Sequence, residues 1–226
     1  MGHRNGKRLR LIPSHLPLIR DKIVEKQRKR LKRQHDATQY REALAAAWDE
    51  ADQMATPQLW WISRDMAKLA ADTAAVGDYP KNHPPAASGV MIIDGGLPVD
   101  ASPVGFKTNI DGFFWVVSGG ETTVYPMTDD PETLEKTGAA DVGLPVDLMI
   151  GSGALADDAD ANAALLHAWV DFAQAVWALS EETRICQAKP GEPSAVHPLP
   201  SRFDPEIRKV KMLVLRENLH RPGESA

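Results

Sequence analysis

The stretch GFFWVVSGGETTVYPM, residues 112–127, contains two runs of aromatic and β-branched residues separated by Ser118, Gly119 and Gly120. Such runs favour β-strands, and glycine readily adopts the positive φ angles that tight hairpin turns require. The pattern therefore predicts an antiparallel β-hairpin in which residues 113–117 pair with residues 122–125.

Several other segments show the spacing of regular elements around this hairpin. An amphipathic pattern predicts a helix over residues 18–54, or two helices joined near His35. Helices are also expected over 64–76, after the capping residue Ser63, and over 157–178. The proline-rich stretch 188–205 reads as a loop. Further strands are predicted at 59–62, 89–94, 144–150 and 206–216.

This order of elements predicts an α+β fold, with a mainly antiparallel sheet packed by helices on one face and a long basic N-terminal helix. Strand alternation places the rings of Trp60 and Trp61 on opposite faces of the sheet. Two apolar stripes on helix 157–178 predict that Trp169 and Trp177 are buried. The polar side of the same helix, expected to face outward, consists of His167, Asp171 and Gln174.

Charge is distributed unevenly along the 226 residues, although the net charge is only −5. The first 35 residues hold 12 Lys and Arg against Asp21 and Glu25, whereas the other 191 hold 14 basic and 29 acidic residues. We therefore expect two parts: a basic arm and helix extension over residues 1–39, and a single α+β domain over 40–226. Such asymmetry bears on the choice of partners rather than on the fold.

The basic character peaks in EKQRKRLKRQ, residues 25–34, which carries six positive charges on ten residues. Like charges four residues apart destabilise a helix, so an anionic partner would offset their repulsion. The candidates are a DNA or RNA backbone, an acidic protein face, and the acidic part of a second copy of the chain; a merely solvated helix is the remaining alternative. The residues predicted to contact nucleic acid are Lys22, Lys26, Arg28, Lys29, Arg30, Lys32 and Arg33.

No pattern of catalytic residues emerges. Gly151, Ser152 and Gly153 lack the Gly-Lys-Ser/Thr continuation of a phosphate loop, and a flexible turn explains them better. The calcium-loop pattern beginning at Asp158 lacks both its glycine and its final glutamate. The histidines and Cys186 do not have zinc-ligand spacing. His167 and Asp171, four residues apart, fit a helix-surface pair better than an acid–base pair. Neither a cofactor nor a metal site is therefore predicted.

Four segments resemble a family of actinobacterial, phage and plasmid proteins of unknown function. They are LWWISRDMAKLAADTA (59–74), SGVMIIDGGLP (88–98), HAWVDFAQAVWALSEETRI (167–185) and EIRKVKMLVLRENLHRP (206–222). In that family a short aromatic strand and a capped helix precede a small β-layer, a Trp-containing helix and a strand rich in Val, Leu and Arg. The resemblance covers roughly residues 57–220 and implies a mobile-element context and an intracellular location. It implies no catalytic residue.

Together these features predict a cytoplasmic, non-enzymatic protein whose basic helix contacts nucleic-acid backbone. A single cysteine is compatible with a reducing compartment, and no apolar run reaches the ~18 residues of a membrane span. The alternative is a protein–protein interaction module, such as an inhibitor or accessory factor, that docks through its basic helix or its acidic globular face. An enzyme with an unrecognised active site is the third possibility.

Overall fold

The architecture comes from a computed structural model. It describes residues 11–34, 49, 52–53, 55–79, 84–101, 106–118, 121–128, 147–148 and 159–216. Within these residues the chain is α+β, with a seven-stranded sheet in the order β5-β4-β3-β2-β1-β7-β6. The strands are β1 (Gln58–Ile62), β2 (Ser88–Ala101), β3 (Phe106–Ser118), β4 (Glu121–Thr128), β5 (Asp147–Leu148), β6 (Cys186–Pro190) and β7 (Lys211–Leu215).

The sheet is mixed: most of its pairings are antiparallel, as predicted, but the pairings of its central strand β1 are parallel, which was not predicted. Strand β1 runs parallel to both of its neighbours, β2 and β7, whereas the other four pairings are antiparallel. The parallel pairing of β1 with β2 needs a crossover, and helix α3 (Arg64–Val76) provides it. Ser63 caps α3 as predicted, because its side chain accepts a hydrogen bond from the Met66 amide.

The predicted hairpin is confirmed as the pair β3–β4, with residues 113–117 opposite 122–126. The two central turn glycines lie outside the described residues. Strand β3 also pairs with β2, where the register shifts between Ile92 and Leu97. Positive φ angles of 78° and 72° at Gly95 and Gly96 accommodate this irregularity, because glycine lacks the Cβ that penalises such angles.

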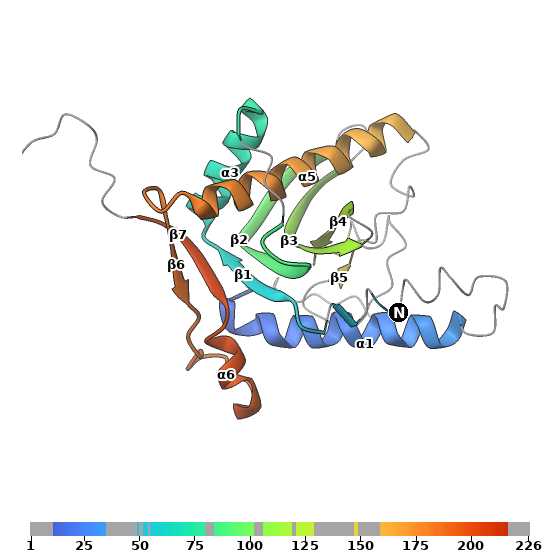
Figure 1. Ribbon diagram of the computed structural model, residues 1–226, viewed down its shortest axis with the longest axis vertical. Helices are drawn as coiled ribbons and strands as arrows, with labels where there is room; N and C mark the ends of the chain where they lie inside the picture. The colour runs from blue at the N-terminus through green and yellow to red at the C-terminus, as the bar shows by residue number, and fades with distance from the viewer. Residues whose placement is uncertain are drawn as a thin grey trace, which may run out of the picture.

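Helices cover both faces of the sheet, whereas one face had been predicted (Figure 1). Helices α3 and α5 (Ala159–Glu181) pack on the first face. Helix α1 (Leu16–Gln34), preceded by the 3₁₀ helix η1 (Pro13–His15), packs on the second. Trp60 belongs to the first core and Trp61 to the second, as strand alternation predicted.

The predicted orientation of the polar residues on α5 is corrected. Trp169 and Trp177 are each 2 % exposed, as predicted, but Asp171 and Gln174 are half-buried rather than outward-facing. The His167 side chain is outside the described part of the chain.

The C-terminal segment also differs from the prediction. Residues 206–216 are not one strand, because helix α6 (Asp204–Ile207), after the 3₁₀ helix η4 (Ser201–Phe203), precedes β7. Strand β6 lies at the start of the predicted loop 188–205. The predicted helix 18–54 is described as helical continuously only to Gln34, and its apolar residues 40–48 lie outside the described residues. The boundary at residue 39 stays a prediction.

Gly89 supports the packing of the largest fully buried side chain, that of Trp115. The two residues face each other across β2 and β3, and a Cβ on Gly89 would lie 2.0 Å from the indole ring. We expect Gly89→Ala to lower the free energy of unfolding by about 1–3 kcal/mol, because an overpacked core must shift. Urea denaturation would measure this loss, and Val76→Ala, at an exposed position, should change stability by less than about 0.5 kcal/mol. A neutral Gly89→Ala would contradict the described ring position.

His15 is buried at the end of η1, and its ring lies 5.8 Å from that of His197. Burial, with a smaller contribution from His197, lowers the pKa of His15 below its usual 6.5. The unfolded chain therefore binds a proton at a higher pH than the folded chain does. Stability should fall as the pH drops below about 6.5, and His15→Gln should flatten this dependence. Urea denaturation between pH 7.5 and 5.5 would test this, and an unchanged slope in the variant would contradict it.

Candidate nucleic-acid interface

The orientation of the basic helix α1 is fixed by its apolar side. Leu16, Ile19 and Ile23, which are three or four residues apart, are buried in the second core together with Val24. Leu31, further along the helix, is 4 % exposed. One side of α1 therefore faces the protein.

Four of the seven predicted contact residues have described side chains, and all four are exposed: Lys22, Arg28, Lys29 and Lys32. The side chains of Lys26, Arg30 and Arg33 lie outside the described part. Since Lys22, Lys29 and Lys32 are separated by seven and three residues, they share one side of the helix. The structure thus brings cations together on the side of α1 opposite its buried stripe.

Local carboxylates interact with this basic face. Lys29 donates to Glu25 at 2.6 Å, and the Lys22 ammonium lies 3.9 Å from the same carboxylate. The hydrogen bond and the charge of Lys29 lower the pKa of Glu25, and Lys22 adds to this effect. Arg28 donates to Asp52 at 3.0 Å. These pairs are solvated, and exposed pairs of this kind contribute little to stability, so an external anion can replace them.

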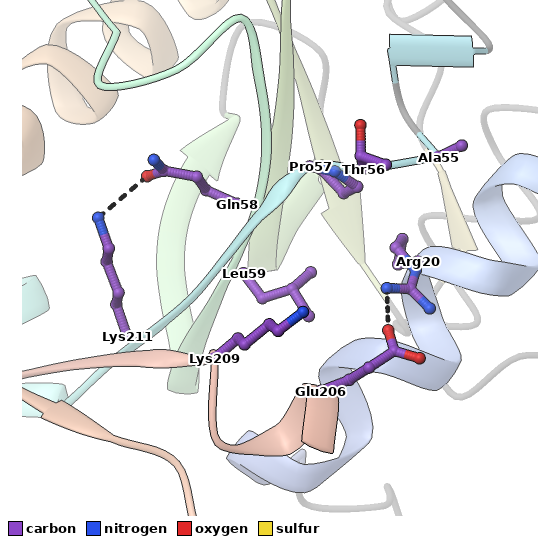
Figure 2. A pocket seen from close by; sticks show the side chains of 9 residues that line it. All are labelled: Arg20, Ala55, Thr56, Pro57, Gln58, Leu59, Glu206, Lys209 and Lys211. Carbon is purple, nitrogen blue, oxygen red and sulfur yellow. Dashed lines mark hydrogen bonds and ion pairs between the residues drawn. The ribbon is translucent and has the colours of Figure 1, made fainter. Parts of the chain in front are cut away.

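A pocket of about 600 Å³ opens beside the buried side of α1 (Figure 2). Three separate segments form it: α1, the chain around the start of β1, and the chain from α6 to β7. Its lining residues are Arg20, Ala55, Thr56, Pro57, Gln58, Leu59, Glu206, Lys209 and Lys211. Sequence reasoning did not find this pocket, because its residues are spread over nearly the whole chain.

Arg20 ties α1 to α6 at one end of the pocket. Its guanidinium donates to Glu206 and, at 2.5 Å and 2.9 Å, to Asp21. Burial alone would lower the pKa of Arg20, but its hydrogen bonds to both carboxylates and their charges raise it above the usual value. With its side chain only 14 % exposed, Arg20 is a structural cation that is already satisfied.

At the other end of the pocket, Lys211 donates to the Gln58 amide oxygen at 3.3 Å, and its ammonium lies 5.2 Å from the centre of the Trp60 ring. The Trp60 indole N–H also donates to that amide oxygen, at 3.0 Å. These contacts fix the orientation of the Gln58 amide. Lys209, in the turn before β7, is exposed and has no carboxylate partner among the described residues.

The possible acid–base pair of His167 and Asp171 is not seen, since the His167 side chain is not described. Asp171 instead meets Tyr79, whose hydroxyl donates to the Asp171 backbone carbonyl at 3.0 Å and lies 3.4 Å from its carboxylate. Burial, followed by the Asp171 charge and hydrogen bond, raises the pKa of Tyr79. Residues 151–158 are not described. The described residues contain no group of three His, Cys, Asp or Glu side chains that could hold a metal.

Cys186 is a structural residue at the start of β6. It is 3 % exposed, and its thiol donates to the Leu179 carbonyl at 2.8 Å. Burial is the main cause that raises the pKa of the Cys186 thiol; nearby Glu182 also raises it, whereas Arg216 lowers it. The thiol therefore stays protonated at neutral pH, and a nucleophilic role would require the opposite shift.

Comparison with known proteins gives no match: no family model, no curated protein and no solved structure matches the chain. The resemblance to actinobacterial and phage proteins therefore stays a prediction. Among the described helices, none has both the length and the apolar composition needed to cross a membrane.

The protected state of Cys186 can be tested directly. At pH 7 we expect iodoacetamide to modify less than about a tenth of the folded chains in a time that gives complete modification in urea, because only the exposed thiolate reacts. Mass spectrometry of the intact chain would count the modified fraction. Equal rates of modification with and without urea would show that the thiol is accessible in the folded chain and could act as a reactive group.

Proposed function

We propose that this protein is a non-enzymatic, nucleic-acid-binding protein of the cytoplasm, and that the exposed face of α1 contacts phosphate backbone. The observation that carries the proposal is the outward presentation of Lys22, Arg28, Lys29 and Lys32 on a helix whose other side is anchored in a core. Anchoring fixes the backbone of the helix before binding. An anionic partner then orders only the ends of the side chains.

The length of this face suits an extended polyanion. Lys22 and Lys32 are ten residues apart, which corresponds to ~15 Å along a helix axis. Duplex DNA carries one negative charge per about 1.7 Å of its axis, so several phosphates can lie within reach of these four cations. Lysine contacts phosphate as a point charge and carries no information about the base sequence. Binding should therefore depend weakly on sequence and strongly on salt.

Glu25 lies between the cations, and replacing it gives a test in which binding is expected to become tighter. It interacts with both Lys29 and Lys22, so it competes with phosphate for the same ammonium groups. Replacing Glu25 by Gln removes this competition and one negative charge, while leaving the buried side of the helix unchanged. Tighter binding of this variant would distinguish an anion-binding face from a face that Glu25 itself helps to form.

The main prediction concerns charge reversal on α1. Replacing Arg28, Lys29, Arg30, Lys32 and Arg33 by Glu should abolish binding to DNA and RNA. The fold should remain, because the described members of this set, Arg28, Lys29 and Lys32, are exposed. Fluorescence anisotropy with two unrelated duplexes at 50 and 200 mM salt would measure the affinities. The wild type should weaken by roughly tenfold or more between these salts if it contacts three or more phosphates, and about equally for both sequences.

Two double variants with equal changes in net charge separate the effect of the location of the charges from the effect of the total charge. Lys29→Glu with Lys32→Glu changes the net charge by the same amount as Lys68→Glu with Lys189→Glu, whose native side chains are exposed on α3 and β6. Only the first pair should weaken binding strongly. If the wild type has no measurable affinity at low salt and the α1 variant instead loses a protein partner or its own oligomer, then α1 is a protein-docking surface. The interaction-module alternative would then replace the proposal.

A further inference from the structure

His15 and His197 bring two imidazole rings together from the N-terminal and C-terminal parts of the chain. His15 ends η1, directly before α1, and His197 lies in the segment between β6 and η4. The centres of the two rings are 5.8 Å apart, and the ring planes are tilted by 58°. Neutral imidazole is the commonest metal ligand among side chains, so this pair is a candidate for a shared ion.

The separation of the two rings fits one ion between them. A zinc–nitrogen bond is about 2.0–2.1 Å long and a ring nitrogen lies about 1.2 Å from its ring centre, so each centre would lie about 3.2 Å from the ion. Two such rings at a tetrahedral angle would have centres about 5.2 Å apart. The measured 5.8 Å is within about 1 Å of this geometry, and rotation of the exposed His197 side chain can turn a ring nitrogen toward the ion.

His15 has a ring nitrogen without a hydrogen-bond partner. The residue is 7 % exposed, and its buried Nδ1 makes no hydrogen bond within the described residues. The hydroxyl oxygen of the preceding Ser14, which is 1 % exposed, is likewise buried and unpartnered in that part of the chain. Buried polar atoms without a partner are costly and rare in native proteins. A ligand for the His15 ring would therefore supply an interaction that the folded chain lacks.

The fold holds His15 in place before any ion binds. Leu11 and Leu16, on either side of η1, are buried in the second core and anchor this turn. His197 is exposed, but its amide donates to the Ser194 hydroxyl at 3.1 Å, which orders the turn that carries the ring. One ligand is thus fixed and buried, and the other lies at the surface, where an ion can enter.

The protonation state of His15 also suits metal binding. Burial, with a smaller contribution from His197, lowers the pKa of His15, so its ring is neutral at pH 7. A histidine must be deprotonated to bind a metal, and proton competition weakens many histidine sites near neutral pH. This competition is reduced at His15.

We propose that His15 and His197 together bind a divalent transition-metal ion of the zinc, nickel and copper group, with water at its remaining positions. These ions accept imidazole nitrogen readily, whereas Mg²⁺ and Ca²⁺ prefer oxygen ligands. Among the described residues, no group of three His, Cys, Asp or Glu side chains could hold a metal. We therefore expect weaker binding than at a structural zinc site with four protein ligands, and an ion that exchanges with solvent.

An ion at this position would join the start of α1 to the chain that leads into η4 and α6. Because it binds only when both rings are in their native places, it would stabilise the folded chain by mass action. The inference does not depend on the proposed function, since neither histidine belongs to the cations of α1 that are proposed to contact phosphate. Failure of nucleic-acid binding would leave the metal site untouched, and the converse also holds.

Isothermal titration calorimetry and thermal unfolding of the full chain at pH 7.5 would use Zn²⁺, Ni²⁺ and Mg²⁺ as probes, after metal has been removed with EDTA. We expect Zn²⁺ and Ni²⁺ to bind. At a free concentration about 100 times the dissociation constant, each should raise the Tm by about 5–10 °C. Mg²⁺ should change neither signal, because the site offers no protein oxygen ligand.

Variants at His197 decide the proposal, because this side chain is exposed and its replacement leaves no cavity. His197→Gln should weaken Zn²⁺ binding by about tenfold or more, whereas the matched variant His197→Cys should retain it, since a thiolate is also a zinc ligand. His15→Gln combined with His197→Gln should lose little more than His197→Gln alone, because both rings bind the same ion.

Three results would overturn the inference. Equal Zn²⁺ affinity in the wild type and in His197→Gln would place the ion elsewhere in the chain. Losses that add in the double variant would indicate two independent sites. A wild type that binds neither Zn²⁺ nor Ni²⁺ at millimolar concentrations, or whose thermal shift Mg²⁺ reproduces, would show that the two rings pack together without forming a metal site.

Discussion

The fold depends on the burial of strand β1 on both of its faces. Leu59 and Trp61 face the core under α1, whereas Trp60 and Ile62 face the core under α3 and α5. A strand that buries apolar side chains in both directions must lie between two covering layers, and here both layers are helical. Its parallel neighbours β2 and β7 complete its backbone hydrogen bonds, and the crossovers to them place helices over the sheet. The helical layers on both faces and the pocket near the start of β1 follow from this position.

The sequence predicted local features well because neighbouring residues determine them. The β3–β4 hairpin follows from two β-prone runs around a glycine turn, and Ser63 caps α3 through its own side chain. The parallel centre of the sheet could not be predicted in this way. LWWI is a short apolar run that fits either kind of pairing, and its partner β7 lies about 150 residues away. Edge strand β6 has a burial pattern without alternation, so its sequence looks like a loop.

The sequence predicted only part of the structure of the basic helix α1. Its buried residues Leu16, Ile19, Ile23 and Leu31 are spaced correctly for a helix face, but the many charges between them obscured that stripe in the sequence. Long basic side chains can accompany an apolar face, because their alkyl stems tolerate proximity to the core while the charge remains in water. The pocket was beyond prediction, since Arg20, Gln58 and Lys211 converge only through the tertiary fold.

Lysine and arginine side chains that look equivalent in the sequence therefore differ in their capacity to bind an anion. Arg20 is part of the charge-rich N-terminal segment, yet two carboxylates satisfy its guanidinium, and a ligand would have to displace one of them. Lys29 has only a solvated partner, whose attraction salt and water largely screen. Lys211 is oriented by the neutral groups of Gln58 and Trp60, so its charge remains available. The number of positive charges in a segment thus overstates its capacity for anions, and that capacity depends on which cations the fold has left without a buried carboxylate.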